Sequence, residues 1–241
     1  FADIDFLNGI QPIFKISSGD LTFLDLIRHA ARTGKPLIIS TGLGTEDEIQ
    51  AAVDVVLTER PMAARDGSVM LMHCVSAYPT PADEANLRNV TWLARRFGFP
   101  TGYSDHTLGI KACELAVAVG AVALEKHFTY RKEDQSFHDH KLSADPADLA
   151  ALVVAVREAE RYLGSEARIR TEAERKLEQH MRRSIGTVVD ISAGTPVRRE
   201  WLTWLRPAWG LGPQDMGCVV GKVLNKDLKA GSIVRAADLS V

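Results

Sequence analysis

The chain has 241 residues, of which 46% are hydrophobic and 25% charged, and its formal net charge is -2 at pH 7. A chain of this length can bury a full core, and its near-neutral charge does not favour nucleic acid or an acidic membrane as a partner. No apolar run reaches the roughly 18 residues that span a bilayer, and no basic-then-apolar leader opens the sequence, so we expect a cytoplasmic protein. The cysteines are odd in number and widely spaced, which predicts free thiols at Cys74, Cys113 and Cys218.

Apolar runs alternate with helical patterns in the first part of the sequence. The runs cover residues 13–18, 36–41, 69–74, 101–106 and 122–128. Turn-forming residues follow each run, and a helical pattern comes next, as at 45–59 and 109–120. Strands that alternate with helices predict a parallel sheet, in which ligands bind at the carboxyl ends of the strands.

The pattern changes after a long amphipathic helix predicted at 145–165. The charged, Ala-rich residues 164–180 are expected to form a partly helical linker, which ends a first domain at 1–163 and precedes a second domain at 181–241. Within the second domain, "DISAGTPVRREWL" from Asp190 and "DLKAGSIVRAADL" from Asp227 repeat the same Asp, Ala, Gly, Val, Arg and Leu pattern. Two copies cannot propagate a solenoid, so the repeat predicts a small pseudo-symmetric β domain.

Two histidines end consecutive predicted strands. Side chains two residues apart on a strand share a face, so Ser104 should face the same way as His106, and Glu125 the same way as His127. If these strands are neighbours, the four groups converge, and two imidazoles there would suit Mn²⁺ or Mg²⁺ as a Lewis acid better than a closed zinc site. A histidine at a strand end is more often a hydrogen-bonded structural residue, and the residues alone leave both interpretations open.

Other polar residues follow the strands with less specific patterns. Lys15 fits a Schiff-base lysine, a phosphate clamp or a solvated side chain, and strand alternation would place Ser17 on its face. Ser76 and Tyr78 share a face just before two prolines, which predict a rigid loop, although a tyrosine before proline is also a common packing corner.

The motifs, taken in order, are specific as a set. They are "FKISSGD", "PLIISTG", "HCVSAYPTP", "GYSDHTLG", "EKHFT", "DHKLS", "RRS", "RPAWG" and "VVGKVLNKDL". In this order they resemble the sialic acid synthase family, which includes synthases of neuraminic, legionaminic and pseudaminic acids and related spore coat polysaccharide biosynthesis proteins. The resemblance covers essentially the whole chain, and "GYSDH" with "EKHF" is its most specific part.

The resemblance implies an α/β fold, a (β/α)₈ TIM barrel followed by a small antifreeze-like (SAF) β-clip domain. The five apolar runs look like barrel strands four to eight, and "FADIDFL" looks like the end of strand three and the helix after it. We therefore expect an N-terminally truncated barrel with two open parallel edges, which would be inactive without the remaining strands.

The resemblance also implies a reaction. Phosphoenolpyruvate condenses with the open-chain aldehyde of an N-acylated amino sugar, which gives a nonulosonic acid and phosphate. A divalent metal, Mn²⁺ before Mg²⁺, would polarise the aldehyde.

Motif by motif, the resemblance implies that His106 and His127 are the metal ligands. It implies catalytic roles for Lys15 and for Glu125, which would orient the sugar hydroxyls or the attacking water. The groups that hold the phosphate and carboxylate of phosphoenolpyruvate would be Lys15, Ser18 and Ser104.

Four further residues would contact the sugar or support its site. Ser76 and Tyr78 would face the sugar, and Asp139 would support the metal site. Arg206, on the C-terminal domain, would reach into the active site of the partner protomer, which requires a domain-swapped homodimer.

Two other functions remain open. One is a lysine-dependent aldolase, in which Lys15 forms a Schiff base that borohydride traps with pyruvate and no metal is needed. The other is a non-catalytic carbohydrate-binding or ice-binding fragment, although ice binding calls for a regular array of threonines and the repeat region offers Thr187, Thr195 and Thr203.

Overall fold

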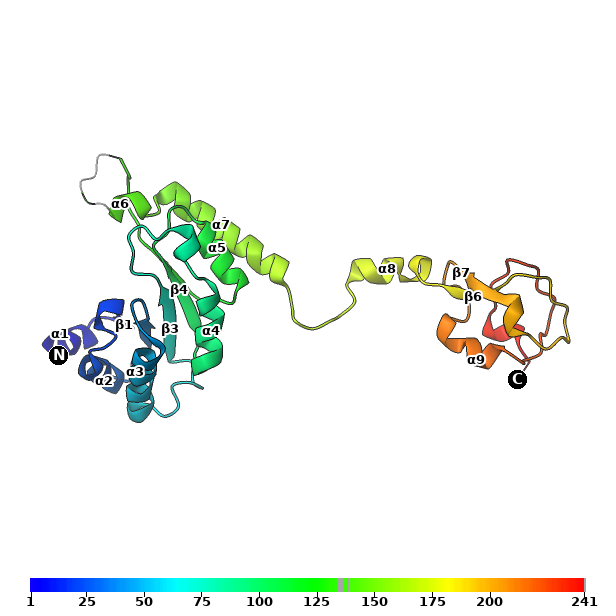
Figure 1. Ribbon diagram of the computed structural model, residues 1–241, viewed down its shortest axis with the longest axis horizontal. Coiled ribbons are helices and arrows are strands. Elements are labelled where there is room, and N and C mark those ends of the chain that lie inside the picture. The colour runs from blue at the N-terminus through cyan, green and yellow to red at the C-terminus, as the bar shows by residue number, and fades with distance from the viewer. Residues whose placement is uncertain (134–136, 138, 241) are drawn as a thin grey trace. The chain divides into compact units, whose positions relative to one another are not determined.

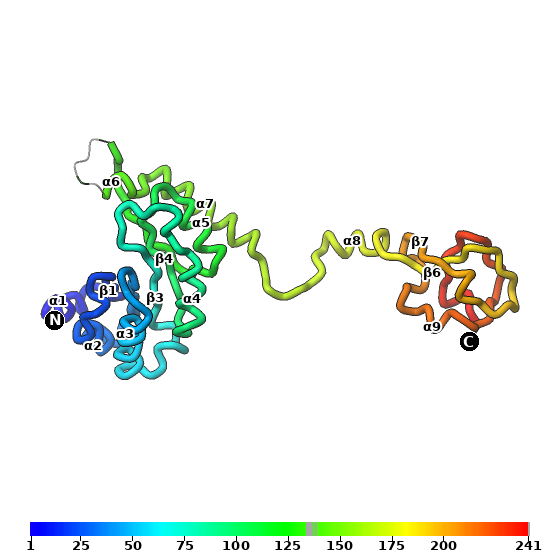
Figure 2. Tube along the Cα trace, in the orientation of Figure 1, coloured from blue at the N-terminus to red at the C-terminus, as the bar shows by residue number. Residues whose placement is uncertain are grey.

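The structure is a computed structural model that describes residues 1–133, 137 and 139–240. The chain divides into two compact units, Phe1–Gly164 and Ser165–Val241 (Figure 1), and Figure 2 traces the same path along the backbone. Each unit has a hydrophobic core of its own.

The first unit is built on a parallel sheet of five strands that follow the order of the sequence. The strands are β1 Phe14–Ile16, β2 Leu37–Ser40, β3 Val69–Cys74, β4 Thr101–Asp105 and β5 Leu124–Lys126. Each strand lies within one of the apolar runs, so the predicted parallel sheet is confirmed. All strands end at one rim, where polar side chains can meet.

The sheet is curled, because its two edge strands approach each other through their side chains. Lys15 on β1 and Glu125 on β5 lie at opposite ends of the strand order, yet Lys15 Nζ is 3.3 Å from Glu125 Oε1. In a flat sheet, four steps of about 4.8 Å would separate these strands by roughly 19 Å, which is more than two side chains can bridge. The first unit is therefore a curled half-barrel of α/β type, consistent with part of a TIM barrel.

One face of the sheet forms the core. Phe14 and Ile16 are buried, whereas Lys15 between them is exposed on the concave face. The buried pattern continues on β2 and β3 with Leu37, Ile39, Val69 and Leu71, and helices α2 (Leu24–Arg32) and α3 (Glu46–Glu59) pack against the same face. The concave face carries Ile38, Met70 and Met72 in the middle strands, and its polar side chains, such as Lys15 and Ser40, lie on β1 and at the strand ends.

Helices connect the strands, and side-chain caps begin the two longest of them. Thr45 Oγ1 accepts a hydrogen bond from the Glu48 N–H, and the Glu48 carboxylate accepts one from the Thr45 N–H. Asp145, just before α7, pairs in the same way with Asp148 in the first turn of that helix. The helices are α1 Ala2–Asn8, α2 Leu24–Arg32, α3 Glu46–Glu59, α4 Arg88–Phe97, α5 Lys111–Ala118, α6 Asp139–Leu142 and α7 Pro146–Leu163.

The second unit is a small β domain in which the two sequence repeats cap each other. Asp227 Oδ1 accepts a hydrogen bond of 2.7 Å from the Ala193 N–H, and Asp190 Oδ1 accepts one of 2.8 Å from the Ala230 N–H. This exchange explains why Asp and the Ala-Gly turn recur together. The elements are α8 Glu172–Met181, β6 Ser184–Thr187, β7 Leu202–Leu205 and α9 Met216–Val219, with β6 and β7 antiparallel.

Two further expectations can be compared with the described residues. Cys74 and Cys113 are buried and Cys218 is exposed, and all three are free thiols as predicted. None of the helices in the described ranges is long and apolar enough to cross a membrane.

His73 is expected to make the stability of the first unit depend on pH. Its side chain is buried, its Nε2 donates to the Ala85 carbonyl at 2.9 Å, and burial lowers its pKa. Because the unfolded chain binds the proton more readily, the free energy of unfolding should fall as the pH drops below about 6.5, the usual histidine pKa. We expect His73→Gln to flatten this dependence between about pH 7.5 and pH 5.5, measured by urea unfolding. His180→Gln on α8 controls for the loss of a histidine, and an unchanged slope in His73→Gln would contradict the account.

Candidate active site

The carboxyl ends of β4 and β5 bring four of the predicted residues together. Ser104 and Glu125 are register partners, and Ser104 Oγ donates to Glu125 Oε1 at 2.7 Å. Two residues farther along, the rings of His106 and His127 lie 5.4 Å apart between centroids. Strand alternation thus predicts this convergence correctly, because the two strands are direct neighbours.

His106 is held with one ring nitrogen engaged. Its Nδ1 lies 2.7 Å from the Val75 carbonyl oxygen, which can only accept, so Nδ1 carries the proton and Nε2 keeps its lone pair. Burial is the main cause that lowers the pKa of His106, and the nearby His127 adds to it. Both effects favour the neutral imidazole, which is the form that binds a metal.

His127 and Tyr78 complete a cluster of rings at this rim. His127 Nδ1 is 3.7 Å from Asp139 Oδ2, which lies at the start of α6. The Tyr78 ring stands 4.1 Å from the ring of His106 and 5.8 Å from that of His127. Burial raises the pKa of Tyr78, so its hydroxyl stays neutral and can donate a hydrogen bond.

Glu125 contacts both the Lys15 ammonium and the Ser104 hydroxyl. Its Oε1 accepts from Ser104 and lies 3.3 Å from Lys15 Nζ. Lys15 and Glu125 remain partly exposed, with side-chain accessibilities of 34% and 40%, so both can contact a ligand on the concave face.

Ser18 lies at the same rim of the sheet, whereas the neighbouring Ser17 makes different side-chain contacts. Ser18 Oγ accepts from the Gly42 N–H at 3.1 Å and lies 3.0 Å from Cys74 Sγ. Ser17 Oγ instead donates to Asp20. The family motif therefore selects Ser18, which contacts residues at the ends of β2 and β3. Strand alternation from Lys15 selects Ser17, which does not make these contacts.

Gly42 allows these groups to pack closely. A Cβ atom at this position would lie 2.6 Å from Ser76 Oγ, 2.7 Å from Cys74 Sγ and 2.8 Å from Ser18 Oγ. All three distances are shorter than side-chain contacts permit, so only glycine leaves the serine hydroxyls in place.

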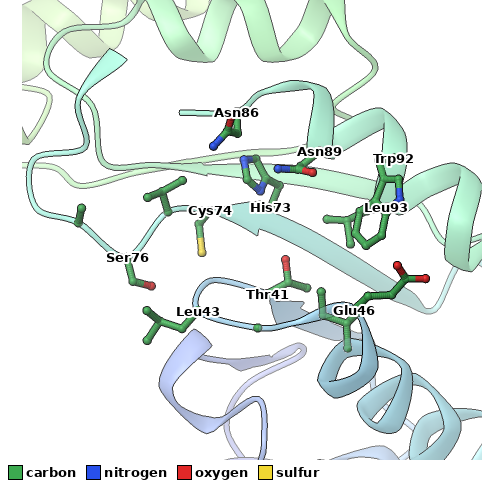
Figure 3. A pocket seen from close by; sticks show the side chains of 14 residues that line it. Thr41, Leu43, Glu46, His73, Cys74, Ser76, Asn86, Asn89, Trp92 and Leu93 are labelled. Atoms are coloured by element: carbon green, nitrogen blue, oxygen red, sulfur yellow. The ribbon is translucent and has the colours of Figure 1, made fainter. Parts of the chain in front are cut away.

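A cavity of about 530 Å³ opens at the end of β3, beside the predicted site (Figure 3). Asn86 and Asn89 reach into it from the start of α4 and His73 from β3, and Thr41 and Glu46 lie opposite. Ser76 lines this cavity, but the other predicted site residues do not.

Sequence reasoning missed several residues of the rim. The Oγ of Ser40, which ends β2, is buried without a hydrogen-bond partner among the described residues. Ser40 lies two positions beyond Ile38, the register partner of Lys15, so it faces the same side. The feature of the sequence that could have identified Ser40 is its position at the end of a strand. The other overlooked residues are Gly42, Cys74, Asp105 and Lys126.

Arg206 belongs to the second unit. It is exposed and directly follows β7. In the described part of the chain, no group of three or more His, Cys, Asp and Glu side chains is arranged to hold a metal, so the two imidazoles stand as a pair.

Comparisons with known proteins agree with this architecture. The NeuB family model matches residues 1–168, and the SAF domain model matches residues 182–240. An uncharacterized protein of Methanocaldococcus jannaschii is 39% identical over 98% of this chain, which covers 68% of that protein. The N,N'-diacetyllegionaminic acid synthase of Legionella pneumophila is 38% identical over 95% of this chain, which covers 64% of that enzyme.

A solved structure has the same fold. A Chromobacterium violaceum protein described as spore coat polysaccharide biosynthesis protein E matches with a TM-score of 0.83 and 27% identity over 100% of this chain and 71% of its own. The chain thus spans about two thirds of the length of its relatives. Because the NeuB model and the SAF model together account for both units, the chain belongs to the NeuB family and carries an SAF domain.

Proposed function

We propose that this chain is part of a nonulosonic acid synthase, which condenses phosphoenolpyruvate with an N-acylated amino sugar aldehyde and releases phosphate. The observation that carries the proposal is the meeting of a cation, hydroxyls, a carboxylate and two imidazoles at one rim of the curled sheet. The name of the Legionella pneumophila relative, a synthase of a diacetylated acid of this class, supports it.

Phosphoenolpyruvate would bind on the side of β1 and β2. Lys15 supplies the positive charge for an anionic substrate, and Ser18 lies where the chain leaves β1. The buried hydroxyl of Ser40 lacks a partner among the described residues, so a ligand oxygen would satisfy it. Ser104 adds a donor from β4, and its bond to Glu125 would exchange for one to the ligand.

A divalent metal fits the two imidazoles. His106 Nε2 has a free lone pair, because Nδ1 donates to Val75, and His127 has Asp139 beside its Nδ1, which is the usual support for a metal-bound histidine. Mn²⁺ or Mg²⁺ bound by His106 and His127 would supply Lewis-acid polarisation of the sugar aldehyde. The two side chains leave coordination positions for substrate oxygens and water.

The sugar would lie between the ring cluster and Glu125. Tyr78 covers His106 and offers its hydroxyl, and Glu125 would accept hydrogen bonds from sugar hydroxyls or from the attacking water. Ser76 would meet the sugar from the segment that follows β3, where it lines the cavity. We assign Arg206 to the N-acyl side of the sugar, contributed by the partner in a domain-swapped homodimer, which its exposed position after β7 allows.

We also propose that β1–β5 are strands four to eight of the barrel. Their sequential parallel order and the curl fit consecutive barrel strands, and the relatives are longer than this chain. The remaining strands would then close the concave face over the ion pair of Lys15 and Glu125.

Phosphate release tests the proposal directly. We expect phosphate release from phosphoenolpyruvate with N-acetylmannosamine and Mn²⁺, or with a bacterial diacetamido sugar, when the chain is extended at its N-terminus to the length of its relatives. EDTA should abolish the release and added Mn²⁺ should restore it. Turnover that persists after complete metal removal would contradict the proposed metal site.

The histidine pair makes a second prediction. In the extended protein, His106→Ala or His127→Ala should lower kcat at least about 10³-fold, because each change removes a metal ligand, while the circular dichroism spectrum stays that of the wild type. His180→Ala, on exposed α8, serves as the control. Near wild-type turnover in either site variant would exclude that residue as a ligand.

The ion pair of Lys15 distinguishes this mechanism from a Schiff-base aldolase. An ammonium held beside Glu125 acts as a cation for phosphate or carboxylate, whereas Schiff-base formation requires the neutral amine. We expect Lys15→Met to raise the KM for phosphoenolpyruvate at least about tenfold, and we expect pyruvate with borohydride to leave the wild-type mass unchanged. A reduced pyruvate adduct on Lys15, detected by mass spectrometry, would favour the aldolase.

A further inference from the structure

Behind the two histidines, on the helix-facing side of the sheet, lies a buried ion pair. Lys126 Nζ is 2.8 Å from Asp105 Oδ2, and the side chains of Lys126 and Asp105 are 4% and 0% accessible. The two residues are register partners at the last position of the ladder between β4 and β5. Each one directly precedes a histidine of the candidate site, so the ion pair and the imidazoles occupy opposite faces of the same two strand ends.

The ammonium holds the chain on both sides of His106. Besides Asp105, which precedes His106, Lys126 Nζ donates to the carbonyl of Thr107, which follows it, at 2.5 Å. The Asp105 carboxylate contacts the same residue, because its Oδ1 accepts a hydrogen bond of 2.8 Å from the Thr107 N–H. One side chain of β5 therefore fixes both neighbours of the histidine on β4.

The Asp105 carboxylate accepts hydrogen bonds from several further groups. Its Oδ1 also accepts from the Tyr103 hydroxyl at 3.1 Å, and its Oδ2 from Cys113 Sγ at 3.3 Å. Burial and the Asp105 charge raise the pKa of both Tyr103 and Cys113, so each stays protonated as a donor. The groups that face this pair from the strands and from α5 thus hold Asp105 in one orientation.

We propose that Asp105 and Lys126 are positioning residues for metal binding: their ion pair fixes the ends of β4 and β5 so that the imidazoles of His106 and His127 meet. The inference rests on the proposed function, since it assigns the two histidines to a metal. The pair contacts neither substrate nor metal. Its effect passes through the backbone of the residues that flank His106 and of the residue that precedes His127.

The test is a Mn²⁺ titration of the extended protein, in which electron paramagnetic resonance measures free Mn²⁺. Removal of a group that supports metal ligands weakens metal binding by about 10- to 100-fold. We expect Lys126→Met to raise the dissociation constant for Mn²⁺ at least about tenfold. Lys111→Met is the matched control, because it breaks an exposed ion pair of 2.6 Å with Glu114 on α5, and it should leave the dissociation constant unchanged.

A double variant separates positioning from stability. Lys126→Met alone leaves the Asp105 charge buried and unpaired, which can unfold the protein. Asp105→Asn with Lys126→Met removes both charges, and the asparagine can still accept from the Thr107 N–H. If the double variant folds with the wild-type circular dichroism spectrum and still binds Mn²⁺ at least about tenfold more weakly, the positioning role stands.

Two outcomes would overturn the inference in different ways. Wild-type Mn²⁺ affinity in the folded double variant would show that the pair serves only stability, while phosphate release by the unaltered protein would leave the proposed function intact. If the unaltered protein shows neither Mn²⁺ binding nor phosphate release, the proposed function fails and the inference fails with it.

Discussion

The curl of the parallel sheet is the constraint on which the candidate site depends. Strand order alone would keep β1 and β5 far apart, because they are the two edges of the sheet. The ion pair of Lys15 with Glu125 shows that the concave face brings these edges together. A cation from the first strand, a hydroxyl from the fourth and a carboxylate from the fifth thereby face one small volume. The parallel ladder adds direction, because every strand delivers its last side chains to the same rim.

The ends of β4 and β5 use both faces of the sheet. On the concave face they carry the hydroxyl, the carboxylate and the imidazoles, which must stay accessible to ligands. On the opposite face they carry a desolvated ion pair whose carboxylate accepts from a hydroxyl, a thiol, an amide and an ammonium. Burying two charges is costly unless their hydrogen bonds are complete. Here the donors to the carboxylate come from β4, from the residue that follows His106, from β5 and from α5. The buried face of the two strand ends thus fixes the backbone that carries the side chains of the candidate site.

Much of this arrangement could be predicted from the sequence, for physical reasons that differ between residues. Short apolar runs predict the strands. Alternation on neighbouring strands predicts that Ser104 meets Glu125 and that His106 meets His127. Ser18 and Gly42 could not be placed in that way, because they lie where strands give way to turns, whereas Ser40, the last residue of β2, follows the alternation and was overlooked. Asp105 and Lys126 read as ordinary charged residues, and only their burial reveals the pair. Arg206 and Asp139 were assigned from family motifs, and the structure adds for Asp139 its proximity to His127.

The proposed function requires the two strand-end histidines to bind one divalent metal. Electron spin echo envelope modulation of Mn²⁺ bound to the extended protein, grown with ¹⁵N-labelled histidine, tests it most directly because it reports which nitrogens couple to the metal. We expect couplings from two imidazole nitrogens, one of which disappears in His106→Gln and the other in His127→Gln. A Mn²⁺ spectrum without histidine couplings, or one that neither substitution changes, would contradict this expectation.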